Sequence, residues 1–122
     1  MDQTTELLSS FACGLEYEDL SSRVVHQIKR TVVDTLGCAV GGFHSEPATI
    51  ARTLAGSVTS STPSRILGTQ LYSSPDMAGF ANGVMVRYLD CNDPSFSPGR
   101  RHPSHMIPAA LALRRPPDSQ RR

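Results

Sequence analysis

Residues 74–89, SPDMAGFANGVMVRYL, decide the fold class of this chain because they predict a helix with apolar side chains on nearly every face. Ser74 is a typical N-cap, Pro75 suits the first helical position, and Asp76 favours the positive end of the helix dipole. A helix that is apolar nearly all round is usually buried by its neighbours. We therefore expect this helix to be central and buried.

Two glycines, Gly79 and Gly83, lie four residues apart in this helix and share one face. Each glycine costs a helix about 1 kcal/mol relative to alanine. Because this cost falls twice on the same face, we expect a second helix to pack closely there.

Apolar side chains at spacings of three and four residues predict further helices before the central one. Residues 3–13 predict a short helix, which Gly14 stops in the left-handed conformation. Residues 22–40 predict an amphipathic helix, ended by Gly41 and Gly42. Its apolar stripe consists of Val25, Ile28, Val32, Leu36 and Val40, widened by Val24, Val33 and Ala39.

Serine and proline residues set the ends of the remaining helices. Ser45 caps a third helix that has Pro47 in its first turn and runs to Gly56. Pro108 must lie in the first turn of the last helix, which puts the cap of that helix at His105 or later. Residues 65–67 are expected to be only an isolated extended piece. We therefore predict an all-α fold.

Composition limits the class of protein. The chain has 122 residues and 39% hydrophobic content, which is the length of one domain and enough for a core. Its net charge is +1, and −2 without residues 114–122, which does not suit a nucleic-acid-binding module. No apolar run reaches the roughly 18 residues of a membrane span, and the acidic start is unlike a secretory signal. We expect a cytoplasmic protein.

The three cysteines, Cys13, Cys38 and Cys91, have no metal or redox spacing. Cys13 and Cys38 lie on apolar helical faces and are expected to be buried, reduced thiols.

Residues 114–122 are basic and contain two prolines, and we expect a disordered tail there. Because the helix before this tail is short for a globular protein, a shifted reading frame or an alternative end is favoured over a natural terminus.

Acidic and imidazole side chains gather around the loop between the last two helices. Asp90 and Asp93 follow the central helix, and His102 and His105 precede the last one. Such groups at the mouth of a loop suit proton-transfer chemistry. Taken alone, however, the carboxylates are more often solvated turn residues, His102 fits a surface loop, and His105 fits a helix cap. A carboxylate–imidazole metal site is a rival hypothesis, although Pro103 disfavours the regular helix that its two histidines would need.

The same segment resembles the MmgE/PrpD family, which includes 2-methylcitrate dehydratase and cis-aconitate decarboxylase. The family motif, close to RxLDxND…HPSD, reads here as RYLDCND at residues 87–93 and HPSH at residues 102–105. DTLG at residues 34–37 and FANG at residues 80–83 extend the resemblance over nearly all of the chain before the tail. It implies that residues 1–113 are the N-terminal part of a larger helical domain, without the lid domain that follows in the family.

The resemblance also implies a reaction, the dehydration or decarboxylation of a tricarboxylate by acid–base proton transfer without a metal or another cofactor. It assigns catalytic roles to Asp90 and His102, with Asp93 as a second acid. The candidates for binding the anionic substrate are Arg100, Arg101 and Ser104. Taken alone, adjacent arginines are usually a solvated pair. A homodimer is expected for the full-length enzyme.

Two positions depart from the family pattern. Pro94 stands where many relatives have threonine, and His105 replaces the usual aspartate after HPS. Much of the family's active site lies further along the chain, so we expect little or no lyase activity from these residues alone.

The apolar central helix has few partners to cover it, which predicts marginal stability or self-association. The alternative function is a non-catalytic helical interaction module that docks on a full-length homologue or another partner.

Overall fold

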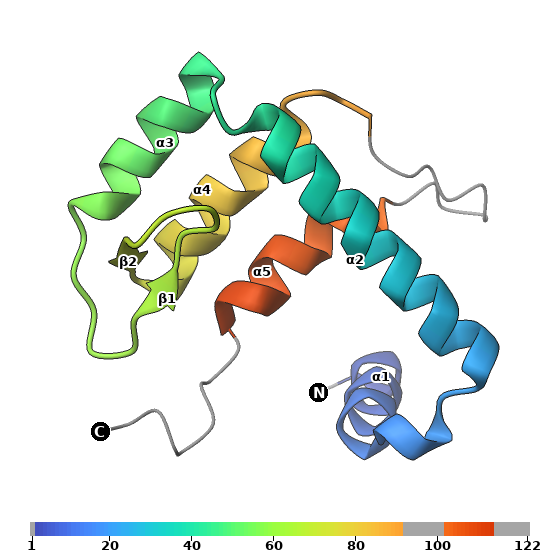
Figure 1. The fold of residues 1–122 in the computed structure, drawn as a ribbon. Coiled ribbons are helices and arrows are strands. Elements are labelled where there is room, and N and C mark those ends of the chain that lie inside the picture. The colour runs from blue at the N-terminus through green and yellow to red at the C-terminus, as the bar shows by residue number, and fades with distance from the viewer. Residues whose placement is uncertain (1, 92–101, 114–122) are drawn as a thin grey trace. The chain divides into compact units, whose positions relative to one another are not determined.

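The structure, a computed structural model, describes residues 2–91 and 102–113. These residues are mainly helical, which confirms the predicted all-α class (Figure 1). The elements are α1 (Gln3–Gly14), η1 (Tyr17–Asp19), α2 (Ser22–Gly42), α3 (Glu46–Gly56), β1 (Ser64–Arg65), β2 (Tyr72–Ser73), α4 (Pro75–Arg87), η2 (Pro103–His105) and α5 (Met106–Leu113). None of the described helices is long and apolar enough to cross a membrane. The chain divides into two compact units, residues 1–30 and residues 31–122.

In the first unit, α1 begins at its N-cap Asp2. The carboxylate of Asp2 accepts hydrogen bonds from the backbone N–H of Thr5, at 3.0 Å, and from the Thr5 hydroxyl, at 2.6 Å. These bonds, the hydroxyl bond first, hold the pKa of Asp2 below its ordinary value. The predicted left-handed stop at Gly14 is wrong, because the helix includes Gly14 and ends through the extended backbone of Leu15. The prediction that Cys13 is buried is also wrong, since this thiol is exposed.

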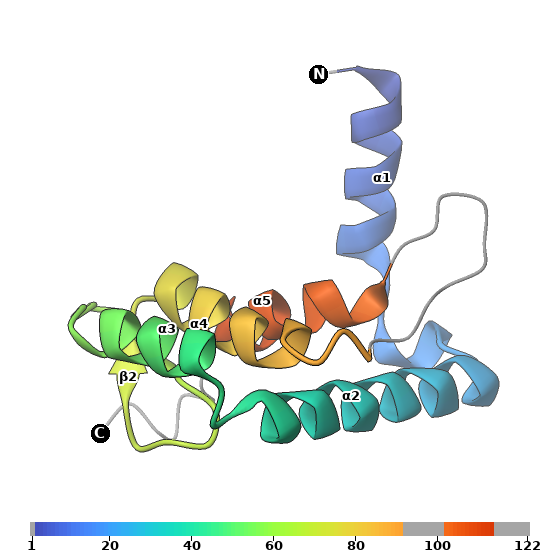
Figure 2. The same cartoon turned by 90° about the horizontal axis from the view of Figure 1, so that it is seen from above.

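In the second unit, α4 packs between α3 and α5, as predicted for the central helix (Figure 1). Figure 2 shows these three helices side by side. The buried residues of α4 are Ala78, Ala81, Asn82, Met85 and Val86. The helix is not covered all round, because Phe80 is 49% exposed. It begins after Ser74, as predicted, and ends at Arg87, slightly before the predicted end.

Small side chains form most of the contacts around α4. In α3, which begins after its predicted cap Ser45, the buried residues are Ala48, Ala51 and Ala55. In the part of α2 that belongs to this unit, the buried residues are Thr35, Cys38, Ala39 and Gly42. The large members of the predicted stripe stay outside the core, and Val40 is 75% exposed. Small residues let the helices approach closely, and many of the large apolar side chains lie on the outer faces.

Close helix contacts involve two glycines. An added Cβ at Gly79 would lie 3.6 Å from the Cβ of Ala112, so α5 approaches α4 there, as predicted. An added Cβ at Gly42 would clash with the carbonyl oxygen of Met85, so α2 and α4 meet at this point. The prediction for Gly83 is wrong, because nothing lies within 4 Å of the corresponding position.

A two-stranded antiparallel ribbon packs against α4. β1 pairs with β2, so the segment expected to be isolated and extended has a partner after all. The chain turns between the strands through Gly68, whose φ of 74° is accessible to glycine without strain. The buried amide of Asn82 accepts from the N–H of Leu67 at 2.9 Å and donates to the carbonyl of Arg65 at 3.2 Å. This side chain therefore fastens the ribbon to α4.

Candidate functional site

The segment after α4 holds the first predicted catalytic residue, Asp90. Its backbone φ is +50°, a left-handed conformation that aspartate tolerates better than most residues. A guanidinium nitrogen of Arg87 lies 2.8 Å from the Asp90 carboxylate, and the Asp90 N–H donates to the Arg87 carbonyl at 3.1 Å. Because the Asp90 side chain is 80% exposed, this ion pair orients the carboxylate more than it stabilises the fold.

The segment before α5 holds the second predicted catalytic residue, His102. The backbone N–H of His105 donates to the carbonyl of His102 at 3.0 Å, which closes the turn of η2. The two imidazole rings lie with their centroids 5.0 Å apart and their planes tilted by 32°. The last helix begins at Met106, with Pro108 in its first turn, so the predicted cap at His105 or later is confirmed.

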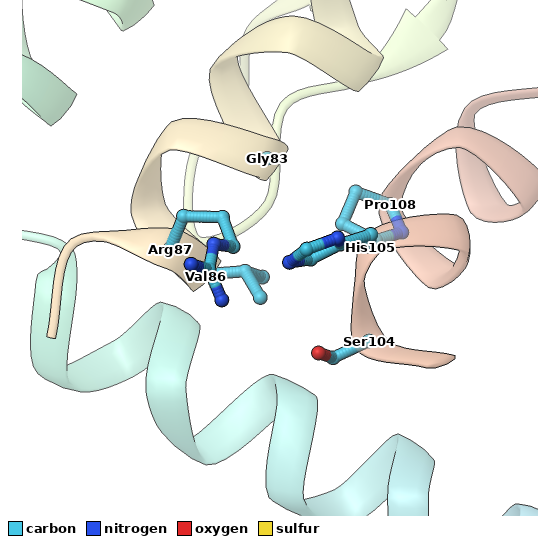
Figure 3. Close-up of a pocket in the computed structure, with 6 residues that line it drawn as sticks. All are labelled: Gly83, Val86, Arg87, Ser104, His105 and Pro108. Carbon is cyan, nitrogen blue, oxygen red and sulfur yellow. The ribbon is translucent and has the colours of Figure 1, made fainter. Parts of the chain in front are cut away.

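A cavity of about 170 Å³ lies between the end of α4 and the start of α5 (Figure 3). The residues that line it are Gly83, Val86, Arg87, Ser104, His105 and Pro108. Ser104 is fully buried, and its hydroxyl oxygen has no hydrogen-bond partner in the part of the chain that the structure describes. A buried hydroxyl without a partner costs about 1–3 kcal/mol, and a catalytic role is one of the explanations for such a group.

The structure brings some of the predicted site residues together. Ser104 lies in the cavity wall, opposite Arg87, and Arg87 also binds Asp90. His102 is half-buried beside His105, which lines the same cavity. The cavity therefore connects the two predicted catalytic segments through the side chains of Arg87 and His105. The predictions for Asp93, Arg100 and Arg101 lie outside the described residues.

Sequence reasoning gave no site role to Arg87, although this residue opens the motif RYLDCND. Its position three residues before Asp90 indicated an ion pair across one helical turn. The sequence placed His105 among the groups that suit proton transfer, with a helix cap or a metal ligand as alternatives, and its place in a cavity wall was not predicted. Among residues 2–91 and 102–113, no three His, Cys, Asp or Glu side chains form a group that could hold a metal ion.

The sequence is similar to those of known proteins. Residues 6–116 match the MmgE/PrpD N-terminal domain. Human cis-aconitate decarboxylase is 29% identical over 110 residues, which are 89% of this chain and 23% of that protein. The 2-methylcitrate dehydratase of Cupriavidus necator is 34% identical over 100 residues, 79% of this chain and 20% of that enzyme. A 2-methylcitrate dehydratase-like protein of Aspergillus oryzae is 31% identical over 116 residues, 91% of this chain and 23% of that protein. The chain thus spans about a fifth to a quarter of the length of these relatives.

Proposed function

Since the chain belongs to the MmgE/PrpD family, we propose that it supplies the N-terminal part of a lyase that dehydrates a tricarboxylate related to 2-methylcitrate. The observation that carries the proposal is the cavity between α4 and α5, whose walls connect Asp90 with His102 through Arg87 and His105. Residues 1–113 would be the N-terminal portion of the helical domain. We propose that the reaction needs no metal and takes place in the cytoplasm, in a homodimer of the complete enzyme.

Dehydration of such a substrate removes a proton from a carbon next to a carboxylate and protonates the hydroxyl group that leaves. Each transfer needs a group that is placed beside the substrate and titrates near the working pH. In this proposal His102 and Asp90 exchange these protons, and Asp93 assists as a second acid. Groups of this kind typically speed a reaction by about a hundred- to ten-thousand-fold.

Binding the substrate's carboxylates falls to donors around the cavity. Arg87 is proposed to bind a substrate carboxylate, because it lines the cavity and its planar guanidinium matches the geometry of a carboxylate. The Ser104 hydroxyl would gain a partner if a substrate oxygen or a group from the rest of the enzyme reached it. Arg100 and Arg101 are proposed as further substrate-binding residues.

Two alternatives remain as proposals. Human cis-aconitate decarboxylase is a relative of similar identity, and decarboxylation also needs a proton donor at the carbon that loses carbon dioxide.

The non-catalytic interaction module is favoured by a different observation, the large apolar side chains on the outer faces of the second unit. Ile50, Leu54 and Phe80 are each about half exposed. Such surfaces often mark a protein interface.

An assay of two proteins separates these alternatives. The first is the chain by itself, and the second is a fusion of residues 1–113 to the remainder of the C. necator dehydratase. We expect the first to be inactive and the second to dehydrate 2-methylcitrate. Decarboxylation of cis-aconitate by the fusion would replace dehydration as the assigned reaction. A folded fusion with no lyase activity, together with tight binding of the isolated chain to the intact dehydratase, would favour the interaction module.

A further inference from the structure

Two cysteines that are distant in the sequence, Cys38 and Cys91, meet in the second unit. The Sγ atom of Cys38 lies 3.9 Å from the backbone carbonyl oxygen of Cys91. Cys38 faces the core and is only 7% exposed, whereas Cys91 is exposed in the segment that follows α4. We propose that Cys38 and Cys91 form a disulfide when the chain meets a small disulfide oxidant such as oxidised glutathione.

The contact places the backbone of Cys91 beside the Cys38 sulfur. A carbonyl oxygen lies about 2.4 Å from the Cα of its own residue, so the Cys91 Cα is within about 6.3 Å of the Cys38 sulfur. A disulfide holds the two Cα atoms about 4.4–6.8 Å apart, so the Cys91 segment has to adjust toward α2 for the bond to form. The thiol of Cys91 now donates to the carbonyl of Leu89 at 3.3 Å and must rotate to reach Cys38. Cys91 lies outside every helix and strand, so its backbone can shift without breaking a helix.

The different exposure of the two thiols sets the order of the reaction. The Cys91 thiolate attacks one sulfur of oxidised glutathione, the glutathione disulfide breaks, and one glutathione thiolate leaves and takes up a proton. Cys38 then gives its proton to the solvent, and its thiolate attacks the Cys91 sulfur. This second exchange releases the other glutathione, so two protein thiols are oxidised while one glutathione disulfide is reduced to two thiols.

The bond would have structural consequences. It would fix the residue that directly follows Asp90 to the buried side of α2, across a sequence separation of 53 residues. A disulfide that closes a long loop restricts the unfolded chain and so favours the folded state. The oxidised chain should therefore unfold at a higher temperature than the reduced chain. This inference does not depend on the proposed lyase activity.

In the experiment, the full reduced chain is oxidised with oxidised glutathione. The product is then digested without reduction, and mass spectrometry identifies the disulfide-linked peptides. Cys13 is an internal competitor, because it is also exposed. We expect most of the intramolecular disulfide to link Cys38 to Cys91. We also expect the midpoint of thermal unfolding to rise on oxidation. The same treatment in urea should give all three pairings, since the fold no longer selects one.

Two variants complete the test. Cys13→Ser should keep the bond and the rise in midpoint, and Cys91→Ser should lose both. The proposal is overturned if the main bond in the folded chain includes Cys13, if Cys91 carries only glutathione, or if the bond forms only between chains. Cys91 was chosen for substitution because it is exposed, so its loss should not prevent folding.

Discussion

The substitution Gly42→Ala tests how closely α2 and α4 meet. Gly42 is buried at the end of α2, and an added Cβ would overlap the carbonyl oxygen of Met85. It would also lie 3.3 Å from the Cβ of Tyr88. A carbonyl oxygen inside a helix cannot rotate away, so α4 as a whole would have to shift. The new methyl group should therefore separate the two helices rather than fill a gap.

Two opposing effects set the size of the change. Extra atoms in a well-packed contact typically cost about 1–3 kcal/mol. Alanine is favoured over glycine in a helix by up to about 1 kcal/mol, and by less at a helix end. The packing cost exceeds the helix preference, and we expect Gly42→Ala to lower the free energy of unfolding by about 1–2 kcal/mol.

Urea denaturation followed by far-ultraviolet circular dichroism measures this change, and two other glycines of α2 serve as controls. An added Cβ at Gly37 meets nothing within 4 Å, so Gly37→Ala should leave stability unchanged or raise it by up to about 1 kcal/mol. At Gly41 the nearest atom is the Cδ1 end of the half-exposed Leu89 side chain, which can move away. If Gly42→Ala is as stable as Gly37→Ala, the close contact between α2 and α4 is refuted.

Three further predictions concern other parts of the chain. Asn82→Ala removes the two hydrogen bonds from Asn82 that hold the ribbon to α4. It should lower the free energy of unfolding by about 1–3 kcal/mol in the same urea assay. An unchanged urea midpoint would contradict this role of Asn82. The pKa of Asp2 is lowered in the folded chain from its ordinary value of 3.8. The capping bonds of Asp2 therefore stabilise α1 fully above pH 3.8. This stabilisation is lost as the pH falls through the lower pKa of the folded state. Circular dichroism should show this loss of helix, and Asp2→Asn should remove the part of the pH dependence that comes from α1. The exposed apolar side chains of α3 and α4 predict self-association in sedimentation velocity, and a monomer with a sharp thermal transition would contradict it.

Capping residues made the helix boundaries predictable, because their effect is local. Ser45, Ser74 and Pro108 each mark the start of a helix where the sequence pattern puts it. The buried faces were harder to predict, because they depend on how closely helices approach. Hydrophobic size favours Val40 as a core residue, yet small residues such as Ala48 fill the contacts instead. Side-chain size alone could not show which face of α2 meets a neighbour.

The candidate site was predictable where a motif marks it. The resemblance singled out Asp90, His102 and Ser104, and the structure describes all three around the ends of α4 and α5. The role of Arg87 in joining Asp90 to the cavity depends on a three-dimensional arrangement that the motif does not state. The contact between Cys38 and Cys91 could not be predicted from the sequence either, because it depends on how α2 and the segment after α4 meet.

The central claim is that this chain carries acid–base groups of a lyase. The most direct measurement is the turnover number for 2-methylcitrate of the fusion to the C. necator dehydratase, with Asp90→Asn or His102→Ala introduced. Loss of a general acid or base predicts that each variant is at least about a hundredfold slower, with an unchanged circular dichroism spectrum. His26→Ala, which removes an exposed histidine from the first unit, should leave turnover unchanged. Near-normal turnover in the His102→Ala enzyme would contradict the account and leave His102 with a structural role only.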